Sequence, residues 1–156
     1  MSESYLILQQ APACDPGDWA DALAAVALAC ADGSARDEPR LLRALHALLV
    51  AAPYRGLTAG IALPDAARFA ALIAARAGDA AALALLGADC GYMLSRGNHG
   101  EHLASVILPG QSAETRATGE TLALALVGAT ALALGAVRTA AGAPHEAERR
   151  PAMRLH

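Results

Sequence analysis

Residues 121–137 read TLALALVGATALALGAV and carry no charge between Glu120 and Arg138. On a helix, at 100° per residue, the larger side chains of this run point in different directions rather than along one face. They are Leu122, Leu124, Val127 and Leu132. A helix that is apolar all round lies either in a protein core or in a membrane. We expect a core position, with this run at the centre of the fold and other helices around it.

Two other interpretations of the same run stay open. As a membrane span it is at the short end of the range that crosses a bilayer, about 17–25 residues, and Gly128 and Gly135 would let a second helix pack closely. As a pair of strands it has a Leu/Ala alternation of period two, with a turn at Gly128-Ala129. Alanine is a poor strand former, and alanine and threonine gain little free energy in lipid. Both facts favour the core helix.

The whole chain has the composition of one compact domain. It has 156 residues and a mass of 15.8 kDa, and hydrophobic residues make up 55% of it. This apolar content excludes intrinsic disorder. About a quarter of the residues are alanine, so we expect stability to come from closely packed helices and from the high helix propensity of alanine.

Charge and residue bias exclude several classes of function. The chain has 12 basic residues, all arginine, and 15 acidic ones, for a net charge of −3, so no basic field attracts nucleic acid. The absence of lysine excludes a P-loop and lysine Schiff-base chemistry. Together with the alanine, arginine and glycine bias, it is typical of a GC-rich coding sequence and predicts a bacterial source. No stretch carries a motif specific enough to assign a family.

Cysteine usage and the first residues of the chain predict a cytoplasmic location. Cys14, Cys30 and Cys90 are odd in number and widely spaced, and no CxxC occurs. This pattern argues against a disulfide framework and favours a reducing compartment. The N-terminal stretch lacks the basic region of a signal peptide.

Hydrophobic spacing and helix-end signals predict five helices. Asp18, Asp37 and Asp65 are good N-cap residues, and Pro53 ends the second helix. Gly78-Asp79 combines a helix-ending glycine with a helix-starting aspartate, which is typical of a tight helical hairpin. The expected helices span residues 19–32, 38–52, 65–77, 80–94 and 112–140. Arg36, Arg40 and Arg43 are expected to form the solvated face of the second helix, or to pair with Asp37 and Glu38.

These elements predict an all-α fold: a single-domain bundle of about five helices around the apolar C-terminal helix. A minor two-stranded β element is compatible with the sequence, with residues 5–8 paired to residues 106–108. We expect residues 1–141 to form the helical domain and residues 142–156 to form a flexible polar tail, because that tail is rich in charge and proline.

One stretch, residues 95–111, departs from the alanine-rich composition and contains the candidate site. Its candidate ligand-binding residues are Arg96, Asn98, His99, Glu101 and His102. His99 and His102 are three residues apart, and Cys90 or Asp89 could complete a tetrahedral zinc site with them. We expect no cofactor, and zinc stays open as the alternative. The alternative interpretation is a solvated loop in which glycine, asparagine and histidine simply form turns.

Two classes of function therefore remain. The first is a small protein-interaction or regulatory module, without a catalytic signature, that binds a protein partner or itself as a homo-oligomer. Leftover apolar stripes on alanine-rich helices would be buried by such self-association. The second is a protein or enzyme that binds a small molecule or metal through residues 95–111. We favour the first class, and we expect neither nucleic-acid nor membrane binding.

Overall fold

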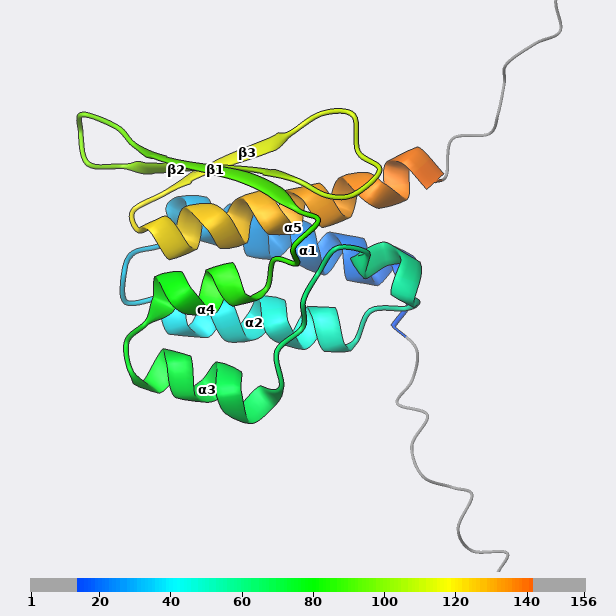
Figure 1. Cartoon of the computed structure of the whole chain (residues 1–156), viewed down its shortest axis with the longest axis horizontal. Coiled ribbons are helices and arrows are strands. Elements are labelled where there is room, and N and C mark those ends of the chain that lie inside the picture. The colour runs from blue at the N-terminus through cyan, green and yellow to red at the C-terminus, as the bar shows by residue number, and fades with distance from the viewer. Residues whose placement is uncertain (1–13, 142–156) are drawn as a thin grey trace, which may run out of the picture.

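The computed structural model describes residues 14–141, and side chains are described up to residue 137. The described elements are α1 (Pro16–Asp32), α2 (Glu38–Val50), a short 3-10 helix η1 (Arg55–Thr58), α3 (Ala66–Ala74), α4 (Gly78–Ala84), β1 (Gly91–Arg96), β2 (His102–Ile107), β3 (Thr115–Gly119) and α5 (Leu122–Ala141). The strands form one antiparallel sheet in the order β1-β2-β3. Figure 1 shows this sheet as a layer above α5 and α1, with α2 and α4 beneath them and α3 farthest from the sheet.

The all-α prediction is wrong, because a three-stranded sheet accompanies the five α-helices of the described part. The minor β element was also misassigned. The strand expected near residues 106–108 exists as β2, but it pairs with β1 and β3. Its expected partner, residues 5–8, and the expected tail, 142–156, lie outside the described residues.

The helix expected over 80–94 ends at Ala84 because the next residues pair with a distant loop. Leu86 bridges to Ile61, and the Gly87 N–H donates to the Gly60 carbonyl at 2.7 Å. A Cβ at Gly87 would lie 2.5 Å from the Gly60 oxygen, so only glycine permits this approach of two backbones. The chain then turns and enters β1 at Gly91.

The helix expected over 112–140 begins ten residues later, at Leu122. Residues 115–119 are taken by the ladder with β2, in which Ala117 lies opposite Ala104. Thr121 then starts the helix, because its hydroxyl accepts a hydrogen bond from the Leu124 N–H at 3.1 Å. This is the side-chain capping that an N-terminal threonine typically provides.

The expectation that the uncharged run is a core helix is confirmed. Every residue from 123 to 131 in α5 is buried, and the buried Thr130 hydroxyl donates to the Leu126 carbonyl within the helix. A Cβ at Gly128 would lie 3.2 Å from the Ala117 Cβ in β3 and 3.4 Å from the Cys30 Cβ in α1. Small residues thus let α5 fit between the sheet and α1. None of the helices between residues 14 and 141 has the length and hydropathy needed to cross a membrane.

The expected N-caps are met in part. Asp65 caps α3 by accepting from the Arg68 N–H at 2.9 Å. Helix α1 starts earlier than expected, since Asp15, rather than Asp18, accepts from the first backbone N–H groups. The Asp37 side chain accepts from the Ser34 N–H and hydroxyl instead of capping α2.

We predict opposite effects of one substitution at two glycines near α5. A Cβ at Gly119 would lie 2.7 Å from the Ala125 backbone nitrogen, so Gly119→Ala must displace backbone and should lower the free energy of unfolding by about 1–3 kcal/mol. A Cβ at Gly135 meets no atom within 4 Å, so Gly135→Ala should raise it by up to about 1 kcal/mol. Urea unfolding followed by circular dichroism measures both. Equal effects of the two substitutions would contradict the close contact between β3 and α5.

Candidate functional site

The predicted ligand-binding residues lie in the turn of the β1–β2 hairpin and at the two strand ends beside it. The Gly97 N–H donates to the Glu101 carbonyl at 2.8 Å, and the Gly100 N–H donates to the Gly97 carbonyl at 3.2 Å. Gly100 has a φ of 92°, which glycine adopts without steric cost. Asn98 and His99 lie at the tip of this turn, and Figure 1 shows the tip projecting beyond the helices.

The hairpin brings some of the predicted residues together, but it does not enclose them. Arg96 lies directly opposite His102 in the ladder. The His102 Nδ1 is 3.1 Å from the Glu120 carbonyl oxygen, so this ring is held at the start of α5. Arg96, Asn98, His99 and Glu101 are exposed. The structure therefore gives this loop the geometry of a solvated turn, without the burial that strengthens polar recognition.

The predicted zinc ligands do not meet. Cys90 precedes the first residue of β1, whereas His102 is opposite its last residue. At about 3.3 Å per strand residue they are roughly 20 Å apart, so one metal ion cannot bind Cys90 together with His99 and His102. No cluster of three or more metal-ligating side chains occurs among the residues that the structure describes.

Cys90 has the surroundings of a structural thiol. Its Sγ donates to the Gly60 carbonyl oxygen at 2.9 Å. Burial raises the pKa of the Cys90 thiol; a hydrogen bond with the Gly87 backbone lowers this pKa by a smaller amount, and the Asp89 carboxylate adds the smallest, raising contribution. A raised pKa reduces the thiolate fraction at neutral pH, which is the opposite of nucleophile activation.

We predict that thiol alkylation reflects these environments. Burial raises the pKa of Cys30 to about 12, so iodoacetamide should modify Cys30 only after unfolding. Because a raised pKa keeps a thiol protonated to higher pH, Cys90 should react more slowly than a cysteine peptide at pH 7–8 and accelerate at higher pH. Peptide mass spectrometry across this pH range measures both rates. Faster alkylation of Cys90 than of the free peptide at pH 7 would contradict the assignment.

The same hairpin carries a feature that the sequence prediction missed, a free edge along β1. Helix α5 packs against β2 and β3, whereas the extensive contacts of β1 are with β2. As a result Tyr92 is 52% exposed and Met93 is 56% exposed. The sequence places residues 91–94 at the end of the helix expected over 80–94, so β1 was not predicted. The turn residues 97–100 between two apolar segments were the signal that could have revealed it.

Backbone groups along this edge alternate in direction. Gly97 donates its N–H to the Glu101 carbonyl, so every second residue before it in β1, Ser95 and Met93, directs its backbone N–H and C=O groups at β2. In an antiparallel ladder, the backbone groups of the residues in between point away from that partner strand. Tyr92, Leu94 and Arg96 therefore direct their backbone N–H and C=O groups away from β2. β1 contains no proline and no lysine, the residues that commonly block pairing at a sheet edge.

Comparison with known proteins yields no relative: no protein-family model, no curated protein and no solved structure matches the chain.

Proposed function

We propose that this protein is a small protein-interaction domain, without catalytic activity of its own, that self-associates through the free edge of β1. The exposed edge strand supports this proposal, since a row of outward-facing N–H and C=O groups pairs readily with another strand. Joining two copies edge to edge would convert two three-stranded sheets into one six-stranded sheet. A cytoplasmic location belongs to the same proposal, and the three free cysteines are compatible with it.

A second copy fits this edge because β1 can pair with itself about a two-fold axis. Antiparallel pairing is isologous, so the same surface serves both partners. Placing the axis at Leu94 sets Leu94 opposite its own copy and Tyr92 opposite Arg96 of the second copy. In this register Tyr92, Leu94 and Arg96 each lie opposite one of these three residues in the second copy. A shift of two residues would leave one of the three without such a partner.

The side chains in this register are complementary. Tyr92, Leu94 and Arg96 share the face of the sheet that carries Ala117, and that face is directed towards α5. Leu94 is half-buried against the core, whereas Tyr92 and Arg96 are exposed, so both ends of this face are open to a second strand. Two symmetric Tyr92–Arg96 pairs would form, each a cation–π contact of about 0.5–1 kcal/mol at an exposed site. Only one short strand pairs with its copy, so we expect an association constant typical of a weak, micromolar dimer.

We predict that the intact protein at tens of micromolar has twice the 15.8 kDa chain mass by light scattering coupled to gel filtration. Tyr92→Arg places two arginines opposite each other and should weaken dimerisation by about tenfold or more. The double variant Tyr92→Arg/Arg96→Tyr restores each Tyr–Arg pair with the partners exchanged, and it should recover the dimer.

Thr118→Lys serves as a control, because it adds one positive charge to the opposite face of β3 and should leave the dimer unchanged. Thermal unfolding followed by circular dichroism checks that each variant folds; Tyr92 is exposed, so little change is expected. A wild-type monomer at this concentration, or a Tyr92→Arg variant that dimerises normally, would refute the proposal. A double variant that stays monomeric would refute the register. Capture of a different protein strand by the wild-type monomer would assign the edge to another partner.

A further inference from the structure

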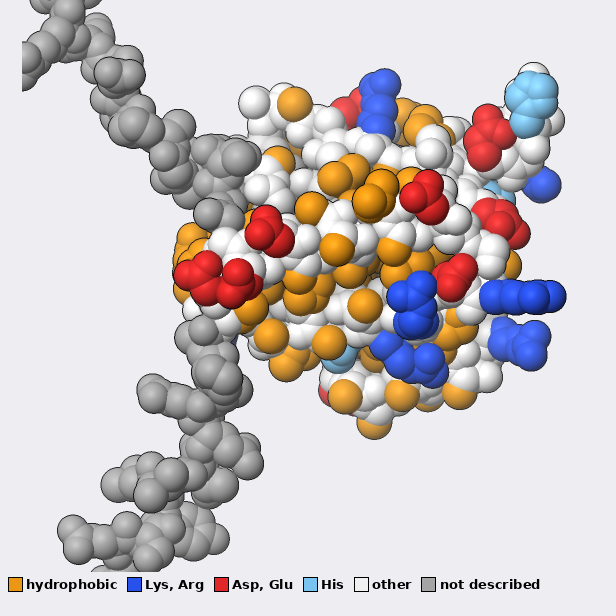
Figure 2. Space-filling model, turned by 180° about the vertical axis from the view of Figure 1, so that it is seen from behind, with side chains coloured by type: hydrophobic (Ala, Val, Ile, Leu, Met, Phe, Trp, Pro, Cys, Tyr) orange, Lys and Arg blue, Asp and Glu red, His pale blue; other side chains and the backbone are white. Residues whose placement is uncertain are grey.

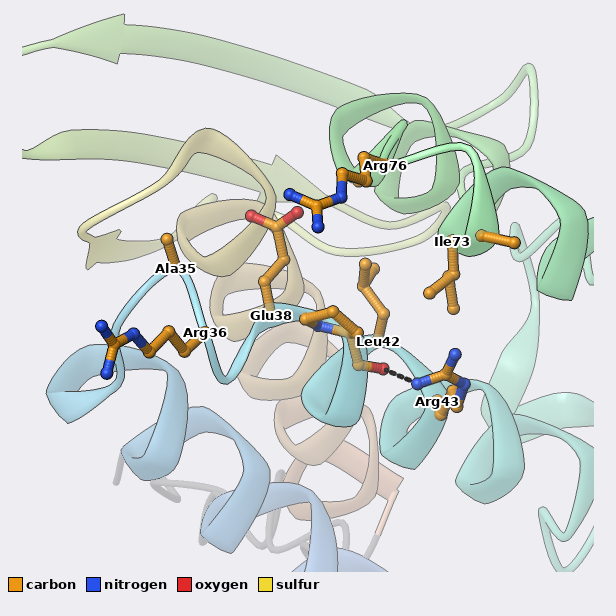
Figure 3. A pocket seen from close by; sticks show the side chains of 10 residues that line it. Ala35, Arg36, Glu38, Leu42, Arg43, Ile73 and Arg76 are labelled. Atoms are coloured by element: carbon orange, nitrogen blue, oxygen red, sulfur yellow. Dashed lines mark hydrogen bonds between the residues drawn. The ribbon is translucent and has the colours of Figure 1, made fainter.

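A groove of about 580 Å³ lies between the start of α2 and the corner that joins α3 to α4. Its walls come from two segments that are distant in sequence, residues 35–43 and 73–78. Figure 3 shows the groove from close by. Its volume lies within the range of small-molecule sites, about 300–1,000 Å³. It is on the helical side of the molecule, away from the sheet, so it is independent of the proposed self-association.

The groove is positively charged in a protein that is acidic as a whole. Arg36, Arg43 and Arg76 line it with exposed side chains, and Glu38 is its one carboxylate. On the face in Figure 2, blue side chains gather at one end of the helical layer. The ion pairs of the described side chains join other residues, Arg40 to Asp37 and Arg116 to Glu114. Three guanidinium groups against one carboxylate leave the groove with a formal charge of +2.

The Glu38 carboxylate is held in place by α5 rather than by an arginine. The Thr121 hydroxyl donates to its Oε2 at 2.6 Å, and Thr121 is the residue that starts α5. On the other side, a Cβ at Gly78 would lie 1.7 Å from the Glu38 Oε1, so any side chain at Gly78 would displace the carboxylate. The expected role of Gly78 as the residue that ends a helix is wrong, because α3 ends at Ala74 and Gly78 is the first residue of α4. It is glycine because a carboxylate packs on it.

The left-handed residue at the end of α3 is Arg76, with a φ of 56°. The Ala77 N–H donates to the Leu72 carbonyl at 2.9 Å, which is the bond of a Schellman ending, where glycine is the usual residue. A residue with a Cβ is disfavoured in this conformation. In Figure 3 the Arg76 guanidinium extends toward Glu38, with Leu42 and Ile73 between it and Arg43. Arg76 thus supplies charge to the groove at a position that the backbone would leave to glycine.

From these observations we infer that the groove binds a small phosphate monoester, with the phosphate at Arg76 and the charges of Arg43 and Arg36 adding attraction from the groove walls. A phosphate monoester carries about −1.5 to −2 charges at pH 7, which matches the +2 of the groove better than a monocarboxylate does. Guanidinium groups recognise phosphate oxygens in bidentate geometry. The apolar walls, including Pro39 and Ala74, would contact the organic part of the ester.

Phenyl phosphate is a suitable probe because it combines a dianion with an apolar ring. We predict saturable binding by isothermal titration calorimetry, with a dissociation constant below about 1 mM, in Tris buffer at roughly 150 mM salt, where exposed charges are screened. Inorganic phosphate lacks the apolar part and benzoate lacks the second charge, so each should bind about tenfold more weakly or worse. Phthalate tests whether any dianion suffices.

Arg76→Gly separates binding from folding. Glycine removes the guanidinium and relieves the left-handed backbone, so the variant should melt no lower than the wild type and bind phenyl phosphate about tenfold more weakly or worse. The matched control, Arg68→Ala, removes one exposed arginine from α3 outside the groove and should change affinity less than about twofold.

Each remaining outcome counts against the inference. Absence of saturable binding by the wild type, or unchanged affinity in Arg76→Gly, would refute the site. Equal losses in Arg76→Gly and Arg68→Ala would show that binding depends on overall charge only. Phthalate binding as tight as that of phenyl phosphate would replace the phosphate assignment with a general dianion site.

Discussion

The packing of α5 between the sheet and α1 determines where every other element can lie. Because Gly128 faces Ala117 on one side and Cys30 on the other, the sheet and α1 approach the same stretch of helix from opposite directions. Alanine and glycine bury little side-chain area per residue, but their small size lets the backbones of neighbouring elements approach each other closely. The chain therefore obtains a core from small side chains by surrounding one helix almost completely.

Both proposed sites depend on how far this central helix reaches. The extensive contacts of α5 with the sheet are with β2 and β3, and Leu94 of β1 is only partly buried against the core, so the outer edge of β1 is left open to a second copy. At the N-terminal end of α5, Thr121 both starts the helix and donates to the Glu38 carboxylate that lines the groove. The same helix thus leaves one surface open for a strand and one open for an anion.

Local signals in the sequence located the five α-helices, but they misplaced the end of α4 and the start of α5 and did not predict the three-stranded sheet. The uncharged run from 121 to 137 predicted a buried helix correctly, because a helix that is buried on every side has apolar residues on every side. The strands failed because their partners are set by tertiary pairing. The predicted helices ran on to Leu94 and began as early as Ser112, because the loop at Gly60 that ends α4 near Gly87 is not visible in the local sequence.

The site predictions divide in the same way. The segment around His99 was singled out by composition, and the composition turned out to be that of a hairpin turn. Its candidate zinc ligand Cys90 was near in sequence but far along the strand. Conversely, Arg43 and Arg76 share a groove although 33 positions separate them. No spacing rule joins two such residues, and only the fold places them on one surface.

Native-state hydrogen exchange of the α5 amides tests the central role of this helix most directly. If α5 is the surrounded core element, the amides of residues 126–134 exchange only when the whole protein unfolds. Their opening free energy then equals the global value from denaturant unfolding within about 1 kcal/mol, while the outlying α3 opens at lower free energy. Exchange of the α5 amides at a free energy well below the global value, or below that of α3, would contradict the account.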